Sequence, residues 1–167
     1  MKIKVFLIGI ILLMGVSVRS TENISSAQAM FIYNFLRHVK WPEGSTGSTF
    51  VIGIYGSSET HSQLLTYTTN RRVGTKPIEV KKISSVDEAV ECQLVFVSAN
   101  QSSKIPSFNS KIGNKPCLII SETEGSTEIG ATIEFLVIDS RLKFRINEAQ
   151  AQKQRLVISR ALLDMAV

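Results

Sequence analysis

Short apolar runs alternate with helical segments through the middle of this chain, and this alternation restricts the folds it can adopt. Each run has the length of a buried strand and is bounded by turn residues. The predicted strands cover residues 50–55, 78–83, 93–98 and 117–121, and the predicted helices cover 59–69 and 86–90. Residues 103–112 are predicted to be mostly loop, with one helical turn at most. Strands that alternate with helices favour a parallel or mixed sheet with helices on both faces.

Both ends of the chain depart from this alternation. Residues 23–40 predict a helix because their apolar positions recur at helical spacing, and Trp41-Pro42 ends it. The β-rich runs 131–138 and 142–146 predict a hairpin, and Asn147 begins a closing helical region. We therefore predict a single α/β domain with a central mixed, mostly parallel sheet flanked by helices, a C-terminal β-hairpin and a closing helix.

The N-terminus has the pattern of a signal peptide. Lys2 and Lys4 precede an uncharged apolar run that is shorter than the ~20 residues a membrane-spanning helix needs. Small residues follow it, and Ser20 is the expected last residue of the leader, with Ser17 as the second candidate. We expect residues 1–20 to be removed on export to the periplasm and residues 21–167 to form the folded domain.

Removal of the leader lowers the positive charge of the chain. The full sequence has a formal net charge of +5, from 19 basic and 14 acidic residues. Without Lys2, Lys4 and Arg19 the count is 16 basic and 14 acidic residues, a net charge near +2. The remaining basic pairs are short and scattered, so we expect no nucleic-acid binding.

The residues that catalysis requires do not form a recognisable motif. His38 and His61 are far apart and have no metal-ligand spacing around them. Ser57 and Ser58 lie close to His61 but lack the Gly-x-Ser-x-Gly turn of a hydrolase, and they are more simply helix caps. We expect no enzymatic activity, no cofactor and no metal.

The two cysteines each begin an apolar run. If the runs after Cys92 and Cys117 are neighbouring parallel strands, the two residues come close enough to form a disulfide in an oxidising compartment. The alternative is two separate buried thiols.

The first helix carries more apolar surface than one packed face uses. Phe31 and Tyr33 lie on opposite flanks of its apolar stripe, and Met30 points away from it. Either the helix is buried on more than one side, or these residues contact another protein or a second copy of the chain.

Four stretches together resemble the YfiR family of periplasmic proteins. They are residues 29–42 (AMFIYNFLRHVKWP), 50–56 (FVIGIYG), 92–98 (CQLVFVS) and 142–147 (LKFRIN) followed by Leu162-Leu163. The resemblance spans residues 26–166, behind a signal peptide. One position departs from the family pattern: Gln154-Arg155 stands where a glycine is expected, so the last helix is expected to run longer or bend differently.

The resemblance implies a regulator. Family members bind the periplasmic domain of an inner-membrane diguanylate cyclase, YfiN, and hold it inactive, and an outer-membrane lipoprotein, YfiB, draws the inhibitor away. The residues expected to contact such a partner, or a second copy in a homodimer, are Met30, Phe31, Tyr33 and Trp41.

A small-molecule sensor or carrier is the alternative function. Parallel strands place their carboxyl ends at one edge of the sheet, where ligands bind. The expected pocket residues, each of which follows a strand, are Gly56, Ser57, Ser98 and Ser121.

Overall fold

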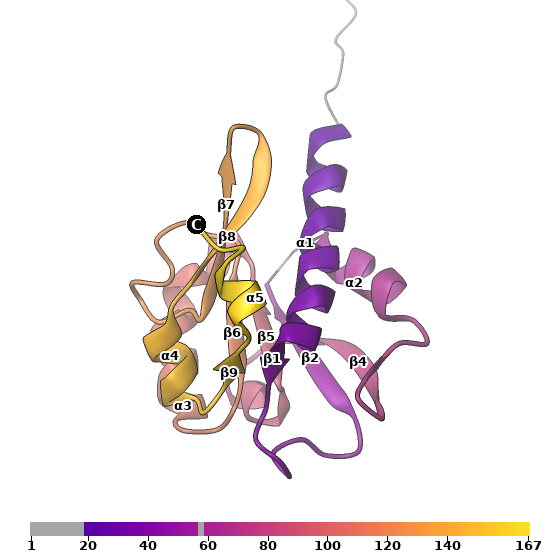
Figure 1. The fold of residues 1–167 in the computed structure, drawn as a ribbon, viewed down its shortest axis with the longest axis vertical. Helices are drawn as coiled ribbons and strands as arrows, with labels where there is room; N and C mark the ends of the chain where they lie inside the picture. The colour runs from indigo at the N-terminus through magenta and orange to yellow at the C-terminus, as the bar shows by residue number, and fades with distance from the viewer. Residues whose placement is uncertain (1–18, 57–58) are drawn as a thin grey trace, which may run out of the picture.

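The computed structural model describes residues 19–56 and 59–167 as one α/β domain (Figure 1). The helices are α1 (Arg19–His38), α2 (Thr60–Thr68), α3 (Ile105–Ile112), α4 (Glu148–Lys153) and α5 (Arg160–Leu163), with 3₁₀ turns η1 (Asp87–Glu91) and η2 (Ala99–Lys104). The strands are β1 (Val39–Lys40), β2 (Phe50–Tyr55), β3 (Arg72–Val73), β4 (Lys76–Ile83), β5 (Leu94–Val97), β6 (Leu118–Ser121), β7 (Ile133–Ile138), β8 (Arg141–Ile146) and β9 (Val157–Ile158). Residues 1–18 of the predicted leader lie outside the described residues, as do Ser57 and Ser58.

The central sheet has seven strands in the order β3-β4-β2-β5-β6-β7-β8. The five strands from β4 to β7 run parallel, and the outer strands β3 and β8 are antiparallel to their neighbours. This confirms the predicted mixed, mostly parallel sheet. Because the inner strands are parallel, β2, β5 and β6 end at the same edge of the sheet.

Helices cover both faces of the sheet, as predicted. On one face α1 packs on a core that includes Phe35, Phe50, Phe96 and Phe135. On the other face α3 packs on a second, smaller core around Phe108. A strand buried on both faces has apolar side chains at successive positions, which is why β5 and β6 are continuous apolar runs.

The hairpin β7–β8 and the N-terminal half of α1 both extend beyond the body of the domain (Figure 1). The hairpin turn consists of Asp139 and Ser140, which both have positive φ angles, of 49° and 59°. Two successive left-handed residues give the turn that matches the twist of the strands. The predicted hairpin is therefore confirmed. Two residues, 139 and 140, connect its strands, whereas three residues, 139–141, were expected.

Two segments differ from the sequence predictions. Residues 103–112, expected to be mostly loop, contain α3: Pro106 lies in its first turn, and Ile105, Phe108 and Ile112 bury one face. The first helix ends at His38, because Val39 and Lys40 form β1, which pairs with β9.

The closing helical region is two short helices separated by β9. Asn147 caps α4 as expected, since its side chain accepts a hydrogen bond from the backbone N–H of Gln150 at 2.9 Å. The helix then stops instead of running longer. Arg155 adopts a left-handed φ of 56°, and the N–H of Leu156 donates to the carbonyl of Ala151 at 2.9 Å. This is a Schellman stop with arginine at the position that glycine usually occupies.

Candidate functional site

A hollow near the strand ends lies between α1 and the hairpin, and we call it the α1–hairpin cleft. It has a volume of about 380 Å³. The residues that line it are Ile24, Gln28, Ala99, Glu122, Glu124, Phe135, Leu136, Val137 and Leu142. They come from α1, from the segments that follow β5 and β6, and from β7–β8, so the cleft opens at the carboxyl edge of the sheet.

Aromatic packing fixes the floor of the cleft. Phe135, one of the lining residues, stacks on Phe35 with ring centroids 5.9 Å apart. Phe31 packs against Phe135 at 6.2 Å and against Phe144 at 5.6 Å. These four rings join α1 to both hairpin strands, so they hold the α1 wall of the cleft against its hairpin wall.

A chain of hydrogen bonds positions the polar side of the cleft. One carboxylate oxygen of Glu122 accepts from the backbone N–H of Ala99 at 2.8 Å, and the other accepts from the amide of Gln28 at 3.4 Å. The carbonyl oxygen of Gln28 accepts from the Thr60 hydroxyl at 2.6 Å. The chain links the segment after β6, η2, α1 and α2 around one end of the cleft.

The strand ends predicted to form a ligand pocket do meet here, but the predicted side chains do not line it. Ser98 and Ser121 are fully buried. The Ser98 hydroxyl donates to Asn100 at 2.7 Å, and that of Ser121 accepts from the N–H of Thr123 at 3.2 Å. The lining residues are the next ones along the chain, Ala99 and Glu122. Ser57 lies outside the described residues.

Gly56 has a packing role beside this pocket. Its φ is 93°, and a Cβ at this position would lie 1.9 Å from the hydroxyl oxygen of Ser98. Glycine therefore lets the end of β2 approach the turn after β5.

The four residues predicted to bind a partner do not form one surface. Met30 is exposed on α1, whereas Phe31 is half-buried in the aromatic cluster. Tyr33 packs on the opposite flank of α1, where the guanidinium of Arg71 lies 4.5 Å from its ring centroid. The Trp41 indole N–H donates to the carbonyl of Gln93 at 3.1 Å. Of these residues, only Phe31 adjoins the α1–hairpin cleft.

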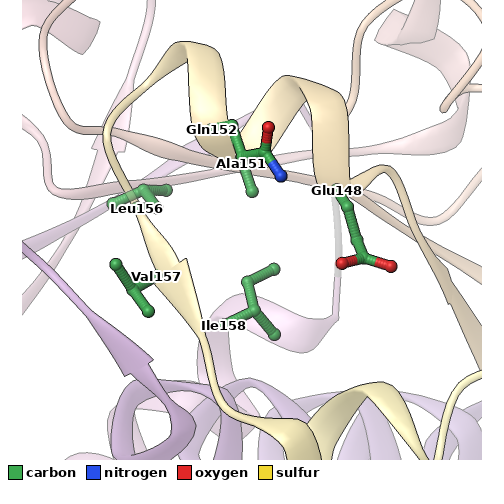
Figure 2. A pocket seen from close by; sticks show the side chains of 6 residues that line it. All are labelled: Glu148, Ala151, Gln152, Leu156, Val157 and Ile158. Carbon is green, nitrogen blue, oxygen red and sulfur yellow. The ribbon is translucent and has the colours of Figure 1, made fainter.

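A second, smaller hollow of about 170 Å³ lies between α4 and β9 (Figure 2). Figure 2 shows the side chains of Leu156, Val157 and Ile158 on one side of it and the Glu148 carboxylate on the other. Ala151 and Gln152 complete its lining. The Schellman stop at Arg155 creates this hollow, because it turns the chain from α4 back towards β1.

Both cysteines are buried free thiols in the structure. The strands that follow them, β5 and β6, are parallel neighbours as expected. Burial raises the pKa of Cys92 to about 11 and raises that of Cys117 further. Thiols that stay protonated in this way are poor nucleophiles.

Within residues 19–56 and 59–167, no three His, Cys, Asp or Glu residues are grouped to hold a metal ion. Burial, followed by the charge of Lys82, lowers the pKa of His61. In the same described part of the chain, no helix has the length and apolar character required to cross a bilayer.

Sequence reasoning missed the part of the site that the hairpin supplies. Phe135, Val137 and Leu142 read as ordinary strand residues, and their alternation indicates only that they share a face of the sheet. The one signal in the sequence was Val137-Ile138, two apolar residues next to the predicted turn. In the structure these side chains are 55% and 40% exposed.

Comparisons with known proteins agree with this architecture. A family model described as YfiR/HmsC-like matches residues 25–167. Among solved structures, a conserved domain protein from Vibrio cholerae O1 biovar El Tor superimposes with a TM-score of 0.57 at 12% identity. The match covers 86% of this chain and 59% of that one, so the chain spans little more than half of its structural relative. No curated protein matches the sequence.

Proposed function

The chain belongs to the YfiR/HmsC-like family, and we propose that it is a periplasmic regulatory protein that inhibits an inner-membrane diguanylate cyclase. In this proposal it binds the periplasmic domain of the cyclase and lowers cyclic-di-GMP in the cytoplasm. An outer-membrane lipoprotein would compete for it and release the cyclase. The observation that carries the proposal is the family match over residues 25–167, which includes every lining residue of the α1–hairpin cleft except Ile24.

The shape of the domain supports binding of a protein. The α1–hairpin cleft lies between two projecting elements, and its rim carries exposed apolar side chains of Ile24 and Val137. Exposed apolar residues around a preformed hollow are typical of interaction sites. Hydrophobic cores on both faces of the sheet support this surface, so it is organised before the partner arrives.

The predicted signal peptide is consistent with a function in the periplasm. The pattern of a signal peptide at the N-terminus supports export to the periplasm, the side of the membrane where a sensor domain of the cyclase is accessible. Inhibition then requires only that the protein bind the inactive state of the cyclase more tightly than the active state.

Deletion of the gene tests the inhibitory role. We expect cyclic-di-GMP to rise in the deletion strain and to return to the wild-type level when the full-length protein is expressed from a plasmid. A version that lacks residues 1–20 should stay in the cytoplasm and fail to complement. Unchanged cyclic-di-GMP after deletion, in cells that express the protein, contradicts the proposal.

A small-molecule sensor or carrier is the second candidate. The volume and position of the α1–hairpin cleft favour it, because small ligands occupy clefts of roughly 300–1,000 Å³ at the carboxyl edge of parallel sheets. A thermal-shift screen against amino acids, nucleotides and vitamins separates the two. A tight ligand without any effect of deletion on cyclic-di-GMP favours the carrier.

A further inference from the structure

We propose that the α1–hairpin cleft binds a segment of a partner protein that presents an apolar side chain beside a lysine or arginine. This inference rests on the proposed function, because it names the chemistry of the partner segment that the regulator would recognise. It follows from two properties of the cleft: apolar walls and a negative mouth.

The walls of the cleft are apolar and partly open to solvent. Ile24 on α1 is 37% exposed and faces the hairpin residues Val137, 55% exposed, and Leu142. Phe135 forms the floor between them. Covering these side chains with an apolar side chain of the partner removes their surface from water and is favourable.

The charged residues among the lining residues are both glutamates, Glu122 and Glu124. Glu122 is oriented by the Ala99 N–H and by Gln28, whereas Glu124 is exposed at the mouth. A cationic side chain beside the apolar anchor would therefore meet carboxylates in the cleft. Such complementarity sets which partner binds and in which orientation.

The cations of the hairpin do not neutralise this charge, because strand alternation turns them away. Leu142 lines the cleft and Phe144 packs in the aromatic cluster on the α1 side. Successive side chains of a strand point to opposite faces, so Arg141, Lys143 and Arg145 lie on the other face. Arg145 accordingly pairs there with the buried Glu134.

The cleft is preorganised for its occupant. The Phe31–Phe135–Phe144 contacts fix the hairpin against α1, and the Glu122–Gln28–Thr60 chain fixes the polar end. A site whose walls are already held in place loses little conformational entropy when it binds. A second copy of this chain is the alternative occupant that the experiments below distinguish.

The first experiment measures binding of the purified periplasmic sensor domain of the cyclase. We expect Val137→Asp to weaken binding at least tenfold, since it places a charge in the apolar wall. Glu124→Lys should weaken binding about two- to fivefold at low salt and make it less sensitive to added salt. The matched controls, Val157→Asp on β9 and Glu128→Lys outside the cleft, should bind like the wild type; both positions are exposed. Circular dichroism and melting curves check that each variant is folded.

The second experiment separates the cleft chemistry from the identity of the partner. Its probes are two fluorescent peptides of equal length, one of leucine and lysine and one of leucine and glutamate. We expect only the lysine peptide to bind, and Glu124→Lys or Val137→Asp to weaken it. Equal binding of both peptides, or no effect of either substitution, overturns the proposed cleft chemistry. If the wild-type protein binds the lysine peptide but not the sensor domain, only the proposed function is contradicted. If the protein instead forms a concentration-dependent dimer that Val137→Asp disrupts, the cleft binds a second copy and the inference is overturned.

Discussion

Glu134 and Arg145 are direct cross-strand partners in the hairpin β7–β8, and their side chains form an ion pair. The Glu134 side chain is fully buried, and it also accepts hydrogen bonds from the N–H and hydroxyl of Thr127, at 2.8 and 3.0 Å. One buried carboxylate therefore ties the hairpin to the turn that follows β6. This turn leads directly from the mouth of the α1–hairpin cleft to its hairpin wall.

The Glu134→Gln variant should be less stable by about 2 kcal/mol at pH 7, because it removes the charge from a buried, hydrogen-bonded pair. Burial raises the pKa of Glu134, but the Thr127 hydrogen bonds and Arg145 outweigh it and hold the pKa below the ordinary 4.5. A carboxylate with a lowered pKa stabilises the fold above its unfolded-state pKa and loses that effect as the pH falls through the folded-state pKa. Urea unfolding at several pH values should show the gap between variant and wild type closing below about pH 4.5.

The exposed Glu128→Gln is the control for this series, and it should unfold like the wild type at every pH. A gap between Glu134→Gln and the wild type that stays constant between pH 7 and pH 3 would show that the charge of Glu134 does not stabilise the hairpin.

The Arg155→Gly variant should be more stable by about 1 kcal/mol, because Arg155 has a left-handed φ of 56° that glycine adopts without a Cβ clash. Lys153→Gly, two residues earlier at the end of α4, should instead cost about 0.5–1 kcal/mol, since it replaces a helical residue. Thermal melts of the two variants should move in opposite directions. A lower melting temperature for Arg155→Gly would mean that its side chain, not its backbone, stabilises this stop.

The elements with a strong periodic signal were predictable. The stripe of Ala29, Ile32 and Phe35 identified α1, and the apolar runs identified the inner strands, because burial on one or both faces leaves a direct pattern in the sequence. The hairpin followed from two β-rich runs around a polar turn. Its strand bounds shifted by one or two residues, as hydrogen bonding rather than hydrophobicity sets where pairing ends.

Features that depend on distant contacts were not predictable. The serines and asparagine of residues 103–112 read as loop, and α3 forms because Ile105, Phe108 and Ile112 pack against the sheet. The pairing of β1 with β9 joins residues more than a hundred positions apart. The sequence predicted a pocket at the carboxyl edge of the sheet, where the cleft lies, but the hairpin wall of the cleft depends on how β7–β8 tilts against α1, which no local pattern encodes.

The two thiols should be unreactive in the folded protein. Burial excludes reagents from Cys92 and Cys117 and raises both pKa values, to about 11 for Cys92. We expect a thiol-specific chromogenic reagent at pH 8 to react slowly with the native protein and to label two thiols per chain in denaturant without reductant. Labelling of no thiol under those denaturing conditions would show that the exported protein carries the Cys92–Cys117 disulfide.

The Phe31→Ala variant should be less stable than the wild type by about 2 kcal/mol, because it removes a half-buried ring from the cluster that joins α1 to the hairpin. Met30 is the matched control: it is the preceding residue on α1 and is 40% exposed, so Met30→Ala should change the free energy of unfolding by less than about 0.5 kcal/mol. Urea titrations followed by the fluorescence of Trp41, the one tryptophan in the chain, measure both values. If Phe31→Ala unfolds at the same urea concentration as Met30→Ala, the aromatic cluster does not hold the cleft together. If Phe31→Ala is destabilised as expected, binding assays with this variant require the fraction folded to be measured in the same sample, so that a lost contact is separated from a loss of folded protein.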